Sequence, residues 1–238
     1  MLAIFTLLYT LTSVANATEA TWEILGINQQ QQLIAYKYSY IEVDGEGNSA
    51  MDCEYPDVPA GQGVLLGLWS AKEGKPIQTW DIYKSILEDP NPETAEDCVT
   101  MREAKKQLQA AKKHYAAQEI DISSHPTGTT PNEDGVYEIV DGQGKKHVFT
   151  VVVFEELPIP DEGAMGGYLL KRWIRNASDE IVYSLELKGV KIMASSLSVQ
   201  FPAAYVVGDQ VVFLQQVSSF SMRHSDTSYS FTSPIDLK

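Results

Sequence analysis

Leu33-Ile34-Ala35-Tyr36-Lys37-Tyr38-Ser39-Tyr40-Ile41-Glu42-Val43 is the stretch that decides the fold of this chain. It is rich in β-branched and aromatic residues, so it predicts a strand. Polar, turn-forming residues precede it at 28–32 and end it at 44–48. Further strands are predicted at residues 22–27, 64–70 and 77–83. Four short strands in succession predict one antiparallel meander.

The remainder of the chain predicts one helix followed by more strands. Residues 94–118 predict a helix with a narrow apolar stripe, made of Val99, Ala104, Leu108, Ala111 and Tyr115. A polar linker follows at 123–134, and a loop is predicted at 158–167. Strands are predicted at 136–140, 147–154, 168–174, 181–187, 196–201, 205–207, 211–220 and 228–231. We therefore expect a mostly β protein of antiparallel meanders, propeller-like or sandwich, with one inserted α-helix.

The first residues predict export. An apolar run over 2–14 ends in Ala15-Asn16-Ala17, which is the small-x-small pattern of a secretion signal at 1–17. The first Lys or Arg is Lys37, whereas such signals begin with positive charge, so a buried helix or an anchor is the alternative. A membrane span needs about 20 apolar residues. We expect a secreted or periplasmic chain without membrane insertion after signal removal. Its regions would be a meander at 18–90, the helix and linker at 91–125, and a β region at 126–238 packed with the meander.

The composition indicates which classes of partner the protein can have. The formal net charge is -14 and 44% of the residues are hydrophobic, which allows a buried core. An acidic surface repels phosphate backbones, so nucleic acid is not expected as a partner. Two cysteines, Cys53 and Cys98, predict one disulfide in an exported chain, with two unpaired thiols as the alternative. No cofactor is expected.

Several short motifs carry a resemblance. Leu33-Ile34-Ala35-Tyr36 and residues 68–77 resemble parts of a blade of a secreted β-propeller, and no second copy occurs. The chain also resembles a bacterial family of predicted secreted proteins of unknown function. The motifs that carry this resemblance are Trp22-Glu23-Ile24-Leu25-Gly26, Arg102-Glu103-Ala104, Val211-Val212-Phe213-Leu214 and Tyr229-Ser230-Phe231. Gln29 to Gln32 replaces the family's usual Asp-Gly turn. The resemblance implies location and fold and supplies no catalytic residues.

Aromatic residues form the first candidate binding site. Tyr36, Tyr38 and Tyr40 alternate along one strand and so share a face. Trp69 and Trp80 are expected on neighbouring strands. Such rings could bind a sugar or a peptide, because they offer flat contact area with polar tips. The alternative is an ordinary half-buried sheet face.

Charged residues form two further candidates. Residues 98–117 hold five bases and one acid, and the five are Arg102, Lys105, Lys106, Lys112 and Lys113. They could dock an anionic partner, or they could pair with acids of the same chain. A weak calcium candidate has alternating oxygen donors at Asp44, Glu46, Asn48 and Asp52. It lacks the glycine and the bidentate glutamate of a calcium loop, so a solvated turn is the alternative.

Motifs for chemistry are sparse. The sequence has no Gly-x-Ser-x-Gly elbow, no phosphate-binding loop and no histidines at metal-ligand spacing. We therefore expect a non-enzymatic binding or structural module of the cell envelope or extracellular space, with a protein or glycan ligand. The alternative is a secreted hydrolase whose site is assembled from distant residues.

Overall fold

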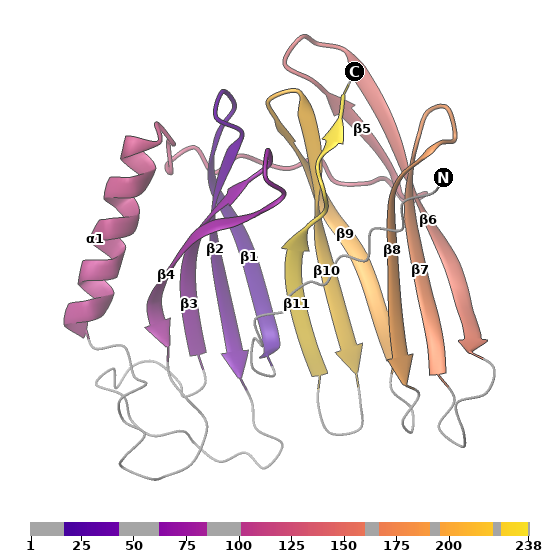
Figure 1. Ribbon diagram of the computed structural model, residues 1–238, viewed down its shortest axis with the longest axis horizontal. Coiled ribbons are helices and arrows are strands. Elements are labelled where there is room, and N and C mark those ends of the chain that lie inside the picture. The colour runs from indigo at the N-terminus through magenta and orange to yellow at the C-terminus, as the bar shows by residue number, and fades with distance from the viewer. Residues whose placement is uncertain are drawn as a thin grey trace.

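The computed structural model describes residues 17–42, 62–84, 101–159, 167–190, 196–220 and 225–237 (Figure 1). Within these ranges the chain forms twelve strands and one helix, which confirms the expected mostly β class. The described strands make three antiparallel sheets of four strands each. They close into neither a barrel nor a propeller ring.

Each sheet comes from one part of the chain. The helix-side sheet contains β1 (Ala17–Asn28), β2 (Leu33–Glu42), β3 (Gln62–Ser70) and β4 (Lys75–Lys84). The far sheet contains β5 (Val136–Val140), β6 (Lys146–Ile159), β7 (Gly167–Asn176) and β8 (Ile181–Val190). The middle sheet contains β9 (Ser196–Val207), β10 (Gln210–Phe220), β11 (Ser225–Phe231) and β12 (Ile235–Asp236).

The elements are stacked in four layers. Helix α1 (Met101–Ala117) covers one face of the helix-side sheet, and the middle sheet lies between the other two sheets (Figure 1). Each interface has its own cluster of buried side chains. Each sheet therefore presents an apolar face to the next layer.

Strand β10 lies at the centre of the stack. Val211 and Phe213 pack toward the far sheet, and Val212 and Leu214 pack toward the helix-side sheet. The side chains of a strand alternate between its two faces, so a strand between two layers must be apolar at every position. The run of four apolar residues at 211–214 meets that requirement, and none of the four is more than 5% exposed.

Aromatic rings fill the interface between the helix-side and middle sheets. Trp22 stacks on Tyr36 with ring centroids 4.2 Å apart, and Phe231 of the middle sheet meets the edge of Trp22 at 5.5 Å. Gly67 lies opposite Tyr36 on β3, and a Cβ there would be 2.1 Å from Cζ of that ring. The absence of a side chain at Gly67 therefore lets the Tyr36 ring lie flat between the sheets.

A turn of glutamines joins these two sheets at one edge. Gln29 accepts a hydrogen bond from the backbone N–H of Gly208 at 2.6 Å, and Gln32 donates one to Asp209 at 2.8 Å. Gly208 has a φ of 67°, a conformation that favours glycine in the tight β9–β10 turn. The glutamines at 29–32 thus do more than turn the chain, because they link β1–β2 to β9–β10.

Strands β9 and β6 differ from the sequence prediction by more than a shift of their ends, and β12 was not predicted. The strands predicted at 196–201 and 205–207 are one strand, β9, which includes Pro202. Strand β9 pairs only with β10 among the described strands, and an edge position tolerates proline because one row of its N–H groups has no partner strand. Strand β6 continues to Ile159 through a bulge between Phe154 and Leu157, so the loop predicted from 158 begins within it.

The helix ends at Ala117, one residue before the predicted end, and its predicted first residues lie outside the described ranges. The segment after it returns along β1, where the carbonyl oxygen of Asp121 approaches Gly26 so closely that a Cβ would be 2.4 Å away. Thr129 then forms a β-bridge with Ala204. Among the described residues, no helix has the length and apolar character needed to cross a membrane.

Candidate functional site

The five candidate aromatic residues lie mostly in the interior. Tyr36, Tyr38 and Trp69 are 3%, 6% and 3% exposed, and Tyr40 is half-buried beside them. Trp80 packs on the opposite face of the helix-side sheet, where it contacts Tyr115 of α1. The five rings therefore do not form one surface, and their burial favours a packing role over contact with a ligand. Burial also raises the pKa of Tyr36 to about 12.

Two other sets of predicted residues lie outside the described ranges. They are the cysteines Cys53 and Cys98 and the calcium candidates Asp44, Glu46, Asn48 and Asp52. The disulfide and the calcium turn both remain predictions. In the part of the chain that the structure describes, no group of three or more potential metal ligands comes together.

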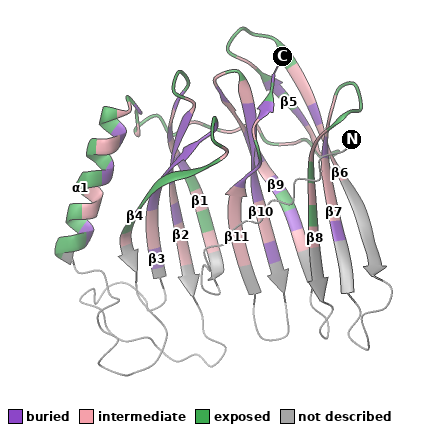
Figure 2. Cartoon of the chain, in the orientation of Figure 1, coloured by how far each residue is buried: buried purple, intermediate pink, exposed green. Residues whose placement is uncertain are grey.

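The predicted cations lie together on the outer face of α1. The inner face is apolar: Ala104, Ala111 and Tyr115 are buried against β3 and β4 and are at most 7% exposed. At 100° per residue Arg102, Lys106 and Lys113 fall opposite these residues, and Lys105 and Lys112 lie on one flank of the helix. All five are exposed, together with Gln109 between them, and Figure 2 shows the same division between the two sides of the helix. We call Arg102, Lys105, Lys106, Lys112 and Lys113 the basic face.

The basic face has no acidic partner within the described residues. Seven ion pairs occur there, and none includes a cation of α1. Intramolecular pairing was the alternative explanation for these residues, and the described part of the chain does not provide it. A cluster of positive charge with no ion pair among the described residues, on a protein with a net charge of -14, is able to attract an anionic group.

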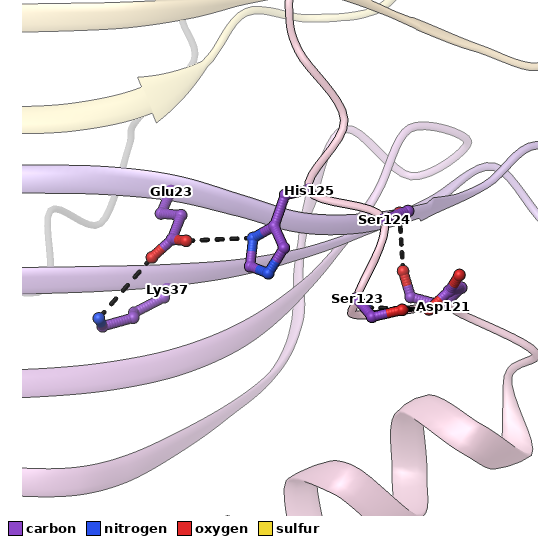
Figure 3. Close-up of polar contacts among 6 residues, drawn as sticks. All are labelled: Glu23, Lys37, Asp121, Ser123, Ser124 and His125. Carbon is purple, nitrogen blue, oxygen red and sulfur yellow. Dashed lines mark hydrogen bonds and ion pairs between the residues drawn. The ribbon is translucent and has the colours of Figure 1, made fainter.

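A second polar cluster lies where the segment after α1 crosses β1 (Figure 3). His125 Nδ1 lies 3.1 Å from Glu23 Oε1, and Lys37 Nζ lies 3.7 Å from Glu23 Oε2. The backbone N–H of His125 donates a hydrogen bond to Leu25, which places the imidazole over the sheet. A carboxylate at Nδ1 orients the ring, as beside a general base, and the two side chains are 55% and 48% exposed.

The serines of this cluster are directed elsewhere. Ser123 Oγ donates to the side chain of Asp121 at 2.6 Å, and Ser124 Oγ donates to the Asp121 carbonyl at 2.8 Å. Hydrogen bonds from Ser123 hold the pKa of Asp121 below its usual value. Neither serine has a hydrogen bond to His125 in the described residues. The cluster therefore has an oriented base, and the two nearby hydroxyls hold the turn instead of acting as its nucleophile.

A third site is a shallow cleft at the end of the molecule, between the far and middle sheets. It has a volume of about 540 Å³, and its lining comes from the β5–β6 hairpin, the β9–β10 turn and Leu237. His147 Nε2 lies 2.9 Å from Asp141 Oδ2 next to it, and both side chains are nearly buried. The backbone N–H groups of Gln143 and Lys145 also donate to Asp141, each at 2.9 Å. Asp141 therefore organises the hairpin that forms one wall of the cleft.

The hydrogen bonds to Asp141 predict that the stability of the folded protein falls at acid pH. They hold the pKa of Asp141 below its ordinary value of 3.8, with His147 as the main cause. A lowered pKa in the folded state stabilises the protein above pH 3.8, and this contribution is lost as the pH falls through the folded-state value. We expect Asp141→Asn to lower the stability at pH 7 and to differ progressively less from wild type below pH 4. Urea unfolding at several pH values measures this, and an equal difference at pH 3 and pH 7 would contradict it.

Sequence reasoning found the basic face and missed the other two sites. The Glu23–His125 contact joins residues 102 positions apart, and no local pattern in the sequence predicts it. The Asp141–His147 pair had a usable signal, because a turn Asp-Gly-Gln-Gly places residues on its two sides opposite each other in a hairpin.

Comparison with known proteins gives no relative: no protein family, no curated protein and no solved structure matches this chain. The resemblance to a family of predicted secreted proteins therefore stays a prediction.

Proposed function

We propose that this protein is an exported, non-enzymatic binding or structural module of the cell envelope or extracellular space. The observation that carries the proposal is the outer face of α1. The inner face of this helix is used in the core, while its outer face presents five exposed cations that have no acidic partner in the described residues. An exposed concentration of one charge on a protein of the opposite charge marks a surface for an external partner.

The fold supports this function by its rigidity. The helix is fixed to the helix-side sheet through Tyr115, whose hydroxyl donates a buried hydrogen bond to the carbonyl of Gly67 at 3.0 Å. A docking surface on a packed helix is preorganised, so binding does not have to order it first. Export is supported by the apolar start of the sequence and its small-x-small end.

A retention experiment tests this function. The purified protein is immobilised and exposed to an envelope extract, and a protein, glycan or lipid should be retained. The same column with Lys105, Lys106, Lys112 and Lys113 changed to Gln is the comparison, and it should retain less. Recovery of no ligand on the wild-type column would refute the proposal.

The second candidate is a hydrolase, and the Glu23–His125 pair is the observation that favours it. An imidazole oriented by a carboxylate is the base of many hydrolytic sites. If this pair is catalytic, a hydrolytic activity toward a simple ester should be lost in both His125→Gln and Glu23→Gln. Activity that is absent in the wild type, or equal in wild type and His125→Gln, would remove this candidate.

A further inference from the structure

We propose that the basic face of α1 is the docking surface for an acidic segment of a protein partner. This inference rests on the proposed function and names the chemistry of the partner. Three features of the described residues lead to it: the geometry of the cations, the acids that surround them, and the side chains that the outer face lacks.

The cations form a stripe of limited length. They occupy positions 102, 105, 106, 112 and 113, so they recur on one side of the helix over about 16 Å at 1.5 Å per residue. Lys105 and Lys106 lie one turn from Arg102, and Lys112 and Lys113 lie two turns further along. Gln109, which is exposed, fills the turn between them. Carboxylates that recur every turn of an acidic helix, or along an extended acidic peptide, can meet this spacing.

Acidic residues lie at both ends of the stripe. Glu103 is exposed on α1 next to Arg102, and Glu119 and Asp121 are exposed directly after the helix. The Debye length at physiological salt is about 8 Å, so these charges act on any anion that extends past the end of the stripe. A broad anionic surface, such as a bilayer or a nucleic-acid duplex, would meet them along with the cations. A segment no longer than the stripe, about 16 Å, would meet fewer of these acids.

The outer face of α1 has positive charge but no exposed aromatic ring and no broad apolar surface. The exposed positions of α1 include no aromatic ring on which a base or sugar could stack. The exposed apolar residues of α1 are the small side chains of Ala110, Ala116 and Ala117, while Leu108 and Tyr115 pack against the sheet, so the helix has no broad apolar face for a membrane. Lysine ammonium groups on flexible stems adapt to carboxylates of a partner without a fixed geometry. The partner surface that matches all three features is an acidic polypeptide.

The experiment measures binding of poly-L-glutamate by fluorescence anisotropy at low salt. The test variant changes Lys105, Lys106, Lys112 and Lys113 to Gln, a residue that forms helix as well as lysine does. The control removes the same charge elsewhere, by changing Lys72, Lys145, Lys146 and Lys171 to Gln. We expect about tenfold weaker binding in the test variant and less than a twofold change in the control. Binding of the wild type should also weaken as salt rises.

Apart from a failure of the wild type to bind poly-L-glutamate, two results would overturn the inference. One is equal loss of poly-L-glutamate binding in the test and control variants, because net charge alone would then explain it. The other is binding to heparin, or to vesicles of phosphatidylserine and phosphatidylcholine, that is as tight as binding to poly-L-glutamate and equally dependent on the four lysines. If the extract column retains a ligand while poly-L-glutamate does not bind, this inference fails and the proposed function stands.

Discussion

Phe213→Ala is expected to lower the free energy of unfolding by about 3–5 kcal/mol, the largest effect of any single change considered. The Phe213 side chain is fully buried on β10. Its ring meets Tyr137 edge-on with centroids 5.0 Å apart, and Phe149 in the same way at 5.7 Å. Truncation removes the apolar contact and leaves a cavity that the rings of the far sheet cannot fill without leaving their own contacts.

Urea unfolding followed by circular dichroism measures this loss. Phe213→Leu is the matched control, because it keeps most of the volume and should lose about 1–1.5 kcal/mol. A typical domain is stable by about 5–15 kcal/mol, so the alanine variant should show a clear shift of the unfolding midpoint. A loss below about 1 kcal/mol for Phe213→Ala would show that the middle and far sheets are not packed as described.

Tyr115→Ala is expected to have the second largest effect, also about 3–5 kcal/mol. Tyr115 is 1% exposed and joins α1 to the helix-side sheet through two contacts. Its ring meets Trp80 edge-on at 5.4 Å, and its hydroxyl bonds the Gly67 carbonyl. Burial raises the pKa of the Tyr115 hydroxyl well above its usual value, so the group stays a neutral donor over the range in which the protein is handled.

Tyr115→Phe separates the two contacts. It keeps the ring and leaves the Gly67 carbonyl without its donor, so it should lose about 1–2 kcal/mol. Amide hydrogen exchange provides a second readout, because α1 should exchange faster in Tyr115→Ala while β9 and β10 keep their protection. Unchanged exchange of α1 in Tyr115→Ala would show that the ring does not anchor the helix. The docking surface would then lack a rigid base.

The individual strands were predictable, and their layering was not. Residues 136–140 form the predicted strand without change, and 33–43 differs by one residue, because β-formers and turn residues act locally. Which sheet packs on which depends on side chains far apart in sequence. The apolar run at 211–214 was the available signal, since a strand without alternation has both faces buried. The prediction divided β9 at positions 202–204, whereas the strand continues through Pro202, which an edge strand tolerates.

For the candidate sites too, the sequence predicted which residues lie together locally, and the structure was needed to show what surrounds them. The basic face was visible in the sequence because helical spacing relates Lys105, Lys106 and Lys112 directly. The absence of described acidic partners for these residues required the structure. The alternation of Tyr36 and Tyr38 correctly placed both rings on one face of their strand, while periodicity alone could not tell whether that face met solvent or another sheet.

The central place of β10 has a consequence for the order of folding. The helix-side sheet and the far sheet are both complete in the chain before β10 is synthesised, since they end at residues 84 and 190. Each then has an apolar face with no cover until residues 196–237 arrive between them. Contacts between such distant segments form slowly, and uncovered sheet faces aggregate. A chain that stops before residue 196 would therefore lack four of the twelve described strands and also the shared core of the two sheets it has already made.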